Sequence, residues 1–234
     1  MNYKFNPDDY EAIEFHDTLH DRIKICPMYF YLGFSPIKNI FGRAAVYYRL
    51  VKALALLPAE YGLLIWDVYR PRVVQAELFL WMREEIRKKL PELNEEEQYA
   101  ETKKYMSAPS QIGDDYCPPH LSGGAIDLTL YSIGTGYELD MGTPFDECSE
   151  RAHSHYYERQ KRLSEDNRFI KERRKLLREA MEHVGFTSYQ YEWWHFDLGT
   201  IFWSNTLNCP SVFGPLFGDE EWPKHIQASL KGAI

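Results

Sequence analysis

Apolar side chains recur at helical or strand spacing in several separate stretches of the chain, and these stretches predict its regular elements. Residues 43–57, 73–90 and 158–184 follow helical patterns, and we expect three helices there. Residues 61–69, 125–131 and 189–198 are short apolar or aromatic runs, which indicates buried strands. Pro71 precedes the second helix and Gly185 follows the third, where such residues commonly begin and end helices.

The order of these elements favours an α+β fold, because helices and strands occur in blocks and do not alternate strictly. A length of 234 residues indicates a single domain over residues 1–234. Residues 91–116 are highly charged, and we expect a surface helix and a loop inserted on the core. Residues 209–234 contain three prolines and little periodicity, which predicts an irregular tail wrapped over the surface.

The charge and its distribution exclude several classes of partner. A net charge of −8 disfavours binding to a nucleic-acid backbone, which depends on clustered basic residues. The basic run Arg173, Arg174 and Lys175 is expected on the solvated face of its helix. No apolar stretch approaches the ~18 residues that cross a bilayer. The N-terminus is polar and acidic and the four cysteines are scattered, so we expect a cytoplasmic protein without membrane or nucleic-acid partners.

Residues 120–127, with the sequence HLSGGAID, place a histidine, two glycines and an aspartate at an apolar strand. An unpaired aspartate between Ile126 and Leu128 would be costly to bury, so a compensating group is expected. A metal ion would compensate the charge, because His120 and Asp127 are both suitable zinc ligands. Asp127 could instead cap a turn, and a single histidine on an apolar strand is more often a satisfied core residue.

A second polar pair, Glu192 and His195, interrupts the aromatic run near residue 193. On an ideal strand these two side chains face opposite sides, so they can share a site only if the backbone bulges or turns. Two histidines and Asp127 on zinc would leave a fourth position for water, as in catalytic zinc sites. Glu192 could then act as a general base toward that water, whose pKa zinc lowers to about 7.

Arg70 ends the strand 61–69 in the sequence WDVYRP. Its guanidinium could hold a developing oxyanion or a carboxylate. The alternative is a structural network in which Arg70 pairs with Asp67 or Asp197. Each of the three segments is a weak signal alone, and together they point to a metal site.

The same segments resemble a known family. HLSGGAIDLTL resembles the SxHxxGxAxD signature of the zinc D-Ala-D-Ala peptidases, EWWHF resembles their ExxH motif, and WDVYRP is similar to their arginine segment. The matches occur in the family's order over roughly residues 45–200 and are nearest to the VanX-type D-alanyl-D-alanine dipeptidase group. The resemblance implies the hedgehog/DD-peptidase-like fold, in which helices flank a central antiparallel sheet.

The resemblance also implies roles for particular residues. It implies one zinc ion per chain, held by three ligands: His120, Asp127 and His195. Glu192 would be the general base, and Arg70 would stabilise the tetrahedral oxyanion. Asp146, in MGTPFDE, would hold the free amino group of the substrate. The predicted activity is hydrolysis of D-Ala-D-Ala or a related D-amino-acid dipeptide through a zinc-activated water.

Two departures from the family pattern lie on the side of substrate recognition. Pro118 stands where the signature has a serine, and KICPMYFYLGF stands where the family has a Tyr-Ala-Thr-type stretch. The hydrolytic chemistry is therefore better supported than the exact substrate. Two alternatives stay open: a D,D- or L,D-carboxypeptidase acting on peptidoglycan stem peptides, and a non-catalytic zinc-binding protein of the same fold.

Overall fold

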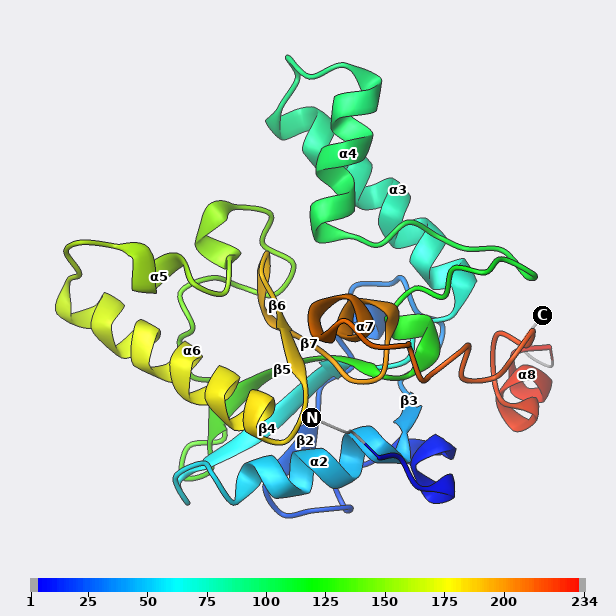
Figure 1. Cartoon of the computed structure of the whole chain (residues 1–234), viewed down its shortest axis with the longest axis horizontal. Coiled ribbons are helices and arrows are strands. Elements are labelled where there is room, and N and C mark those ends of the chain that lie inside the picture. Colours follow the sequence, from blue (N-terminus) through cyan, green and yellow to red (C-terminus); the bar gives the residue numbers. More distant parts are fainter. Residues whose placement is uncertain (1–3, 232–234) are drawn as a thin grey trace.

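A five-stranded sheet in the order β2-β4-β5-β7-β6 forms the centre of the molecule (Figure 1). The structure is a computed structural model that describes residues 4–231. The strands of this sheet are β2 (Ile23–Ile25), β4 (Tyr61–Asp67), β5 (Ala125–Ser132), β6 (Thr187–Tyr189) and β7 (Glu192–Asp197). Neighbouring strands are antiparallel, except that the edge strand β2 runs parallel to β4. The predicted α+β fold is confirmed, with a parallel edge strand that the sequence did not indicate.

Two long helices, α2 (Ala44–Leu54) and α6 (Glu165–His183), pack against this sheet and against each other (Figure 1). Leu50 of α2 and Leu177 of α6 are fully buried in the same apolar cluster as the central strands. Helix α6 begins later than predicted, because the Ser164 hydroxyl caps its first turn by accepting from the amide of Asn167 at 3.2 Å.

Shorter elements complete the described chain. A two-stranded antiparallel sheet pairs β1 (Ala12–Phe15) with β3 (Ile40–Arg43). The short helices and 3-10 turns are η1 (Pro7–Tyr10), α1 (Met28–Tyr31), η2 (His120–Ser122), η3 (Glu150–Ala152), α5 (Tyr156–Arg159), α7 (Ile201–Leu207) and α8 (Lys224–Lys231). Among the described residues, no helix combines the length and apolar character that crossing a membrane requires.

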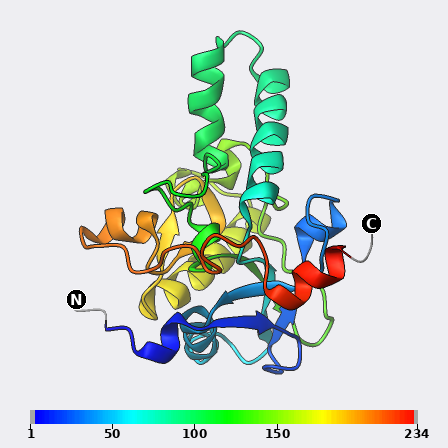
Figure 2. The same cartoon turned by 90° about the vertical axis from the view of Figure 1, so that its right-hand side faces the viewer.

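Helices α3 (Arg72–Lys89) and α4 (Glu95–Tyr105) form a hairpin that projects from the body of the molecule (Figure 2). Asn94 starts α4 with a capping box, because its side chain accepts from the Glu97 amide while the Glu97 carboxylate accepts from the Asn94 amide. The charged segment 91–116 thus contains the predicted helix, followed by an irregular stretch that leads back to the sheet.

The described part of the C-terminal segment lies over the body, and it is not wholly irregular, because it contains α8. Trp222 and Ile226 anchor this end in a second apolar cluster, which also contains Tyr69. Upstream in the tail, the Gly214 carbonyl accepts from the guanidinium of Arg43 at 2.8 Å. The helix was missed because it is short and follows a stretch of glycine and proline.

The prediction that Arg174 lies on the solvated face of its helix is wrong. The side chain is buried and donates to the carbonyls of Met141, Arg151 and His153 at 2.6, 2.8 and 3.2 Å. Burial lowers the pKa of Arg174 to about 9. Arg174 lies at helical spacing from the buried Leu177, and it fastens the loop of residues 141–153 to α6.

Candidate metal centre

Adjacent strands bring the three predicted metal ligands together. Asp127 on β5 is the direct register partner of His195 on β7. His120 lies in η2, which leads into β5. All three side chains are buried, and one ligand atom from each lies within 4.8 Å of the others.

Two glycines allow His120 to fold back over the strand that carries Asp127. Gly123 closes η2 with a φ of +68°, in the left-handed region. A Cβ on Gly124 would lie 2.3 Å from the carbonyl oxygen of Leu198, a separation that no side chain could accept. The HLSGGAID segment therefore needs both glycines for this turn.

The distances among the facing atoms of the three side chains, taken to either carboxylate oxygen of Asp127, fit a tetrahedral metal site. His120 Nε2 lies 3.2 Å from His195 Nδ1 and 3.4 Å from Asp127 Oδ2, and His195 Nδ1 lies 3.0 Å from Asp127 Oδ1. Ligand atoms about 2.0–2.2 Å from a tetrahedral zinc ion are about 3.3 Å apart. The three separations match that value closely.

Each imidazole has an inner nitrogen that faces Asp127 and an outer nitrogen that faces away from it. The hydrogen bond of the outer nitrogen determines whether the inner nitrogen carries a proton. His120 Nδ1 lies 2.8 Å from the carbonyl oxygen of Val68, and His195 Nε2 lies 3.0 Å from Asp197 Oδ2. Both partners only accept hydrogen bonds, so the ring proton belongs on these outer nitrogens. The inner nitrogens then present lone pairs toward the carboxylate of Asp127. A cluster of acceptors without a donor is suited to a cation.

The charges of the cluster lead to the same conclusion. Burial alone would lower the pKa of His195, but the carboxylates of Asp197 and Asp127 raise it well above its ordinary value. Burial alone would raise the pKa of Asp127, but His120 and His195 lower it. The surroundings of these ligands therefore favour a positive charge at their centre.

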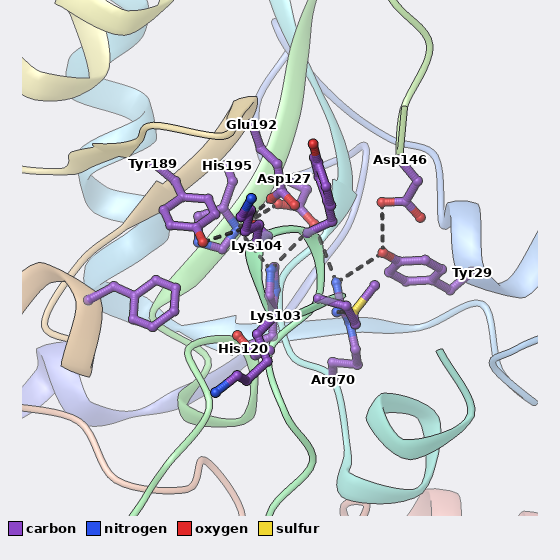
Figure 3. Close-up of a pocket in the computed structure, with 14 residues that line it drawn as sticks. Tyr29, Arg70, Lys103, Lys104, His120, Asp127, Asp146, Tyr189, Glu192 and His195 are labelled. Carbon is purple, nitrogen blue, oxygen red and sulfur yellow. Dashed lines mark hydrogen bonds and ion pairs between the residues drawn. The ribbon is translucent and has the colours of Figure 1, made fainter. Parts of the chain in front are cut away.

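Glu192 reaches the same site through an irregularity in the sheet. The register between β6 and β7 shifts after Ser188, so that Tyr189 pairs with Glu192. Glu192 Oε2 lies 3.9 Å from His195 Nδ1, as the predicted bulge or turn requires (Figure 3). Burial raises the pKa of Glu192 well above its ordinary value, and the nearby charges of Asp127 and Asp146 raise it further.

Arg70 lies beside the ligands and is held from several sides. A register shift between β4 and β5 places Asp67 opposite Asp127, and Asp67 Oδ2 accepts from Arg70 Nε at 2.9 Å. Gln75 Oε1 accepts from Arg70 Nη1 at 3.1 Å, and Arg70 Nη2 lies 3.4 Å from Asp127 Oδ2. Of the two partners in the alternative interpretation, Asp67 forms an ion pair with Arg70, and the other ion pair of Arg70 is with Asp127 and not with Asp197.

Asp146 completes the site from the loop that Arg174 holds. The Tyr29 hydroxyl donates to Asp146 Oδ1 at 3.2 Å and accepts from Arg70 Nη2 at 3.1 Å (Figure 3). The other carboxylate oxygen, Oδ2, is buried with no hydrogen-bond partner. Asp146 also has a φ of +59°, and burial raises its pKa to about 7. An unpartnered, buried acceptor in a strained conformation is characteristic of a ligand-binding position.

The six predicted site residues line one pocket, together with residues 103–107 at the end of α4 and the rings of Tyr189 and Phe202. The space between these side chains is about 360 Å³, including its opening to solvent. Sequence reasoning missed Tyr29, for which no local pattern exists. It also missed the role of Asp197, although the spacing of two from His195 places both on one face of a strand.

Comparison with known proteins identifies the family. A family profile described as D-ala-D-ala dipeptidase matches residues 34–211. The match covers most of the chain and includes Arg70, Asp146 and the metal cluster. The chain belongs to the D-Ala-D-Ala dipeptidase family.

Relatives in this family come from distant bacteria. The D-alanyl-D-alanine dipeptidase of Enterococcus faecalis is 34% identical over 172 residues, which cover 69% of this chain and 75% of that protein. The D-alanyl-D-alanine dipeptidase of Synechocystis is 31% identical over 180 residues, which cover 71% of this chain and 72% of that protein. The family that the sequence predicted is thus confirmed.

Proposed function

We propose that this member of the D-Ala-D-Ala dipeptidase family is a zinc-dependent dipeptidase that hydrolyses D-Ala-D-Ala or a related D-amino-acid dipeptide. The observation that carries the proposal is the convergence of three buried acceptor atoms, from His120, Asp127 and His195, beside the carboxyl group of Glu192.

Zinc is proposed because two imidazoles and a carboxylate at these separations are a typical ligand set of catalytic zinc. A bound zinc ion would polarise the substrate carbonyl and make hydroxide available near neutral pH. Val68 and Asp197 keep the two imidazoles in the tautomer that binds metal.

Glu192 and Arg70 supply the remaining catalytic groups in this proposal. Glu192 accepts a proton from the attacking water and transfers it to the leaving amine, a role favoured by its raised pKa. Arg70 Nη2 faces the ligand cluster and stabilises the negative charge that develops on the carbonyl oxygen. Asp67 and Gln75 keep the guanidinium in that orientation.

Asp146 supports a dipeptidase over the carboxypeptidase alternative. Its unpartnered Oδ2 can accept a hydrogen bond from the terminal ammonium group of a substrate, which a peptide with a blocked amino end lacks. A stem peptide with a blocked amino end would leave this buried oxygen without a partner. The retention of Glu192 beside the metal ligands argues against a non-catalytic binding protein.

The decisive experiment measures release of D-alanine from D-Ala-D-Ala, with L-Ala-L-Ala and N-acetyl-D-Ala-D-Ala as parallel substrates. We expect hydrolysis of the free D,D-dipeptide alone, abolished by a chelator and restored by one zinc ion per chain. Cleavage of the blocked peptide at equal efficiency would favour the carboxypeptidase. No hydrolysis by zinc-loaded protein would favour the non-catalytic alternative.

The cytoplasmic location predicted from the sequence is kept as part of this proposal. A dipeptide with both ends free is small enough to be a substrate inside the cell, unlike a polymeric cell wall. Fractionation of cells that produce the protein, with activity measured in each fraction, tests the location. Recovery of the activity outside the cytoplasm would contradict it.

A further inference from the structure

We propose that Lys104, assisted by Lys103, binds the terminal carboxylate of the substrate and thereby selects peptides whose second residue is the last. The inference rests on the proposed function, because it assigns the end of the dipeptide opposite to Asp146. Figure 3 shows Asp146 and Tyr29 on one side of the site, and Lys104 away from them, in the part of the view that holds His195 and Tyr189.

Residues 104–107, at the end of α4, are held in place by hydrogen bonds from side chains in and beside the site. Three contacts hold them there: Tyr189 OH to the Lys104 carbonyl at 3.0 Å, Gln75 Nε2 to the Ser107 carbonyl at 2.6 Å, and Arg70 Nη1 to Met106 Sδ at 3.2 Å. The anchoring side chains belong to the catalytic arginine, its supporting glutamine and a tyrosine that also lines the pocket. The two lysines are therefore carried by a segment with a defined position relative to the metal ligands.

The charges of the pocket leave these lysines as the groups suited to an anion. Arg70 is the other strong cation among the lining residues, and its guanidinium already donates to Asp67, Gln75 and Tyr29. The ammonium group of Lys104 forms an ion pair with Glu101 on the preceding turn of the helix, and its side chain remains 42% exposed. An ammonium in such an exposed pair can be shared with a second carboxylate at small cost.

A free dipeptide carries an ammonium group and a carboxylate on either side of its single peptide bond. Asp146 offers an unpartnered carboxylate oxygen at one side of the site, and Lys104 offers an ammonium group in the part of the pocket away from Asp146. With the peptide bond at the metal ligands, each charged end of the substrate meets a side chain of opposite sign. This arrangement predicts that the enzyme recognises both the ammonium group and the carboxylate of its substrate.

The test compares D-Ala-D-Ala with its C-terminal amide, which keeps the ammonium group and lacks the negative charge. We expect Lys104→Ala to raise KM for the free acid roughly 10-fold, on the scale of a lost hydrogen bond to a charged group, with kcat nearly unchanged. Hydrolysis of the amide should not change. The double variant Lys103→Ala/Lys104→Ala should bring the acid-to-amide ratio of kcat/KM close to one, whereas Lys104→Arg should retain the preference.

Lys88→Ala is the matched control, because Lys88 forms the same kind of ion pair with Glu85 on α3 and does not line the pocket. It should leave both substrates unaffected. An unchanged acid-to-amide ratio in the double variant would overturn the inference, as would equal use of acid and amide by the wild type, and both results leave the proposed function standing. Hydrolysis of neither substrate by zinc-loaded wild type would overturn the proposed function and this inference together.

Discussion

The two sides of the pocket contrast in how they hold a charge. Asp146 is buried, strained and unpartnered at one oxygen, and its loop is fastened to α6 by Arg174. Lys104 lies half exposed at the end of a projecting helix, where Glu101 balances its charge. A buried charge without a partner costs stability but interacts strongly with a ligand, whereas an exposed pair costs little and contributes less. The amine side should therefore discriminate more strongly than the carboxylate side.

The largest effect is expected for Glu192. This residue lies between the two sides of the pocket and binds neither charged end of the substrate. Glu192→Gln should lower kcat for D-Ala-D-Ala by at least about 100-fold, the scale of a lost general base, with zinc content unchanged. It should lower kcat for the amide by the same factor, because the proton transfer is common to both substrates. Glu179→Gln, on the exposed face of α6, is the control. Full activity in Glu192→Gln would show that another group removes the proton.

The next largest effect tests the amine side itself. Asp146→Asn should lower kcat/KM for the free dipeptide roughly 10- to 100-fold, because a neutral amide cannot pair with an ammonium group. Asparagine tolerates the positive φ at this position, so the fold should be kept. Steady-state kinetics with D-Ala-D-Ala provide the measurement. A kcat/KM equal to that of the wild type would mean that Asp146 does not recognise the amino group.

The contrast between the two sides also depends on Arg174, which holds the loop that carries Asp146. Arg174→Met should destabilise the protein by about 1–3 kcal/mol, because it removes the donor from the carbonyls of residues 141, 151 and 153, the first of these in a buried hydrogen bond. It should also raise KM for the free dipeptide as the loop loosens. Urea unfolding gives the free energy, and Arg173→Met is the neighbouring control, since Arg173 makes an exposed contact with the Asp140 carbonyl. Equal losses in the two variants would remove the special role of Arg174.

The smallest effect concerns pH and the cost of burying Asp146. Burial raises the pKa of this carboxyl from 3.8 to about 7. The folded protein favours the protonated form, so the cost is absent below about pH 4, grows up to about pH 7 and is constant above. Asp146→Asn should therefore melt at a higher temperature than wild type at pH 8 and at nearly the same temperature at pH 4. A difference that is larger at pH 4 than at pH 8 would contradict this assignment.

The sequence predicts the meeting of Asp127 with His195 more fully than it predicts the position of α4. Asp127 and His195 lie on strands with clear apolar patterns, so their meeting required only that these strands be neighbours. Helix α4 was predicted as well, because its charged pattern is local. Its docking beside the metal ligands was not, since it depends on contacts such as Tyr189 to the Lys104 carbonyl, made across 85 residues of sequence.

Arg174 shows a second limit of local patterns. A basic run suggests a solvated face, but helical periodicity turns one residue of any such run toward the core. The carbonyls that receive Arg174 belong to a loop more than twenty residues upstream, which the pattern around residue 174 does not describe. Asp197 differs, because its spacing from His195 was available in the sequence.

Arg43 links parts of the chain that are remote in sequence. Its guanidinium donates to the carbonyls of Tyr10, Ser122 and Gly214, and thus joins an early segment and the tail to the turn that carries His120. Leu216 adds a backbone hydrogen bond to the Leu121 carbonyl at 2.9 Å. Under mechanical load applied through its ends, the molecule would transmit force to this turn before the central sheet parts. Opening of the turn that carries His120 would then be an early step in forced unfolding, and single-molecule extension would register it ahead of the main rupture.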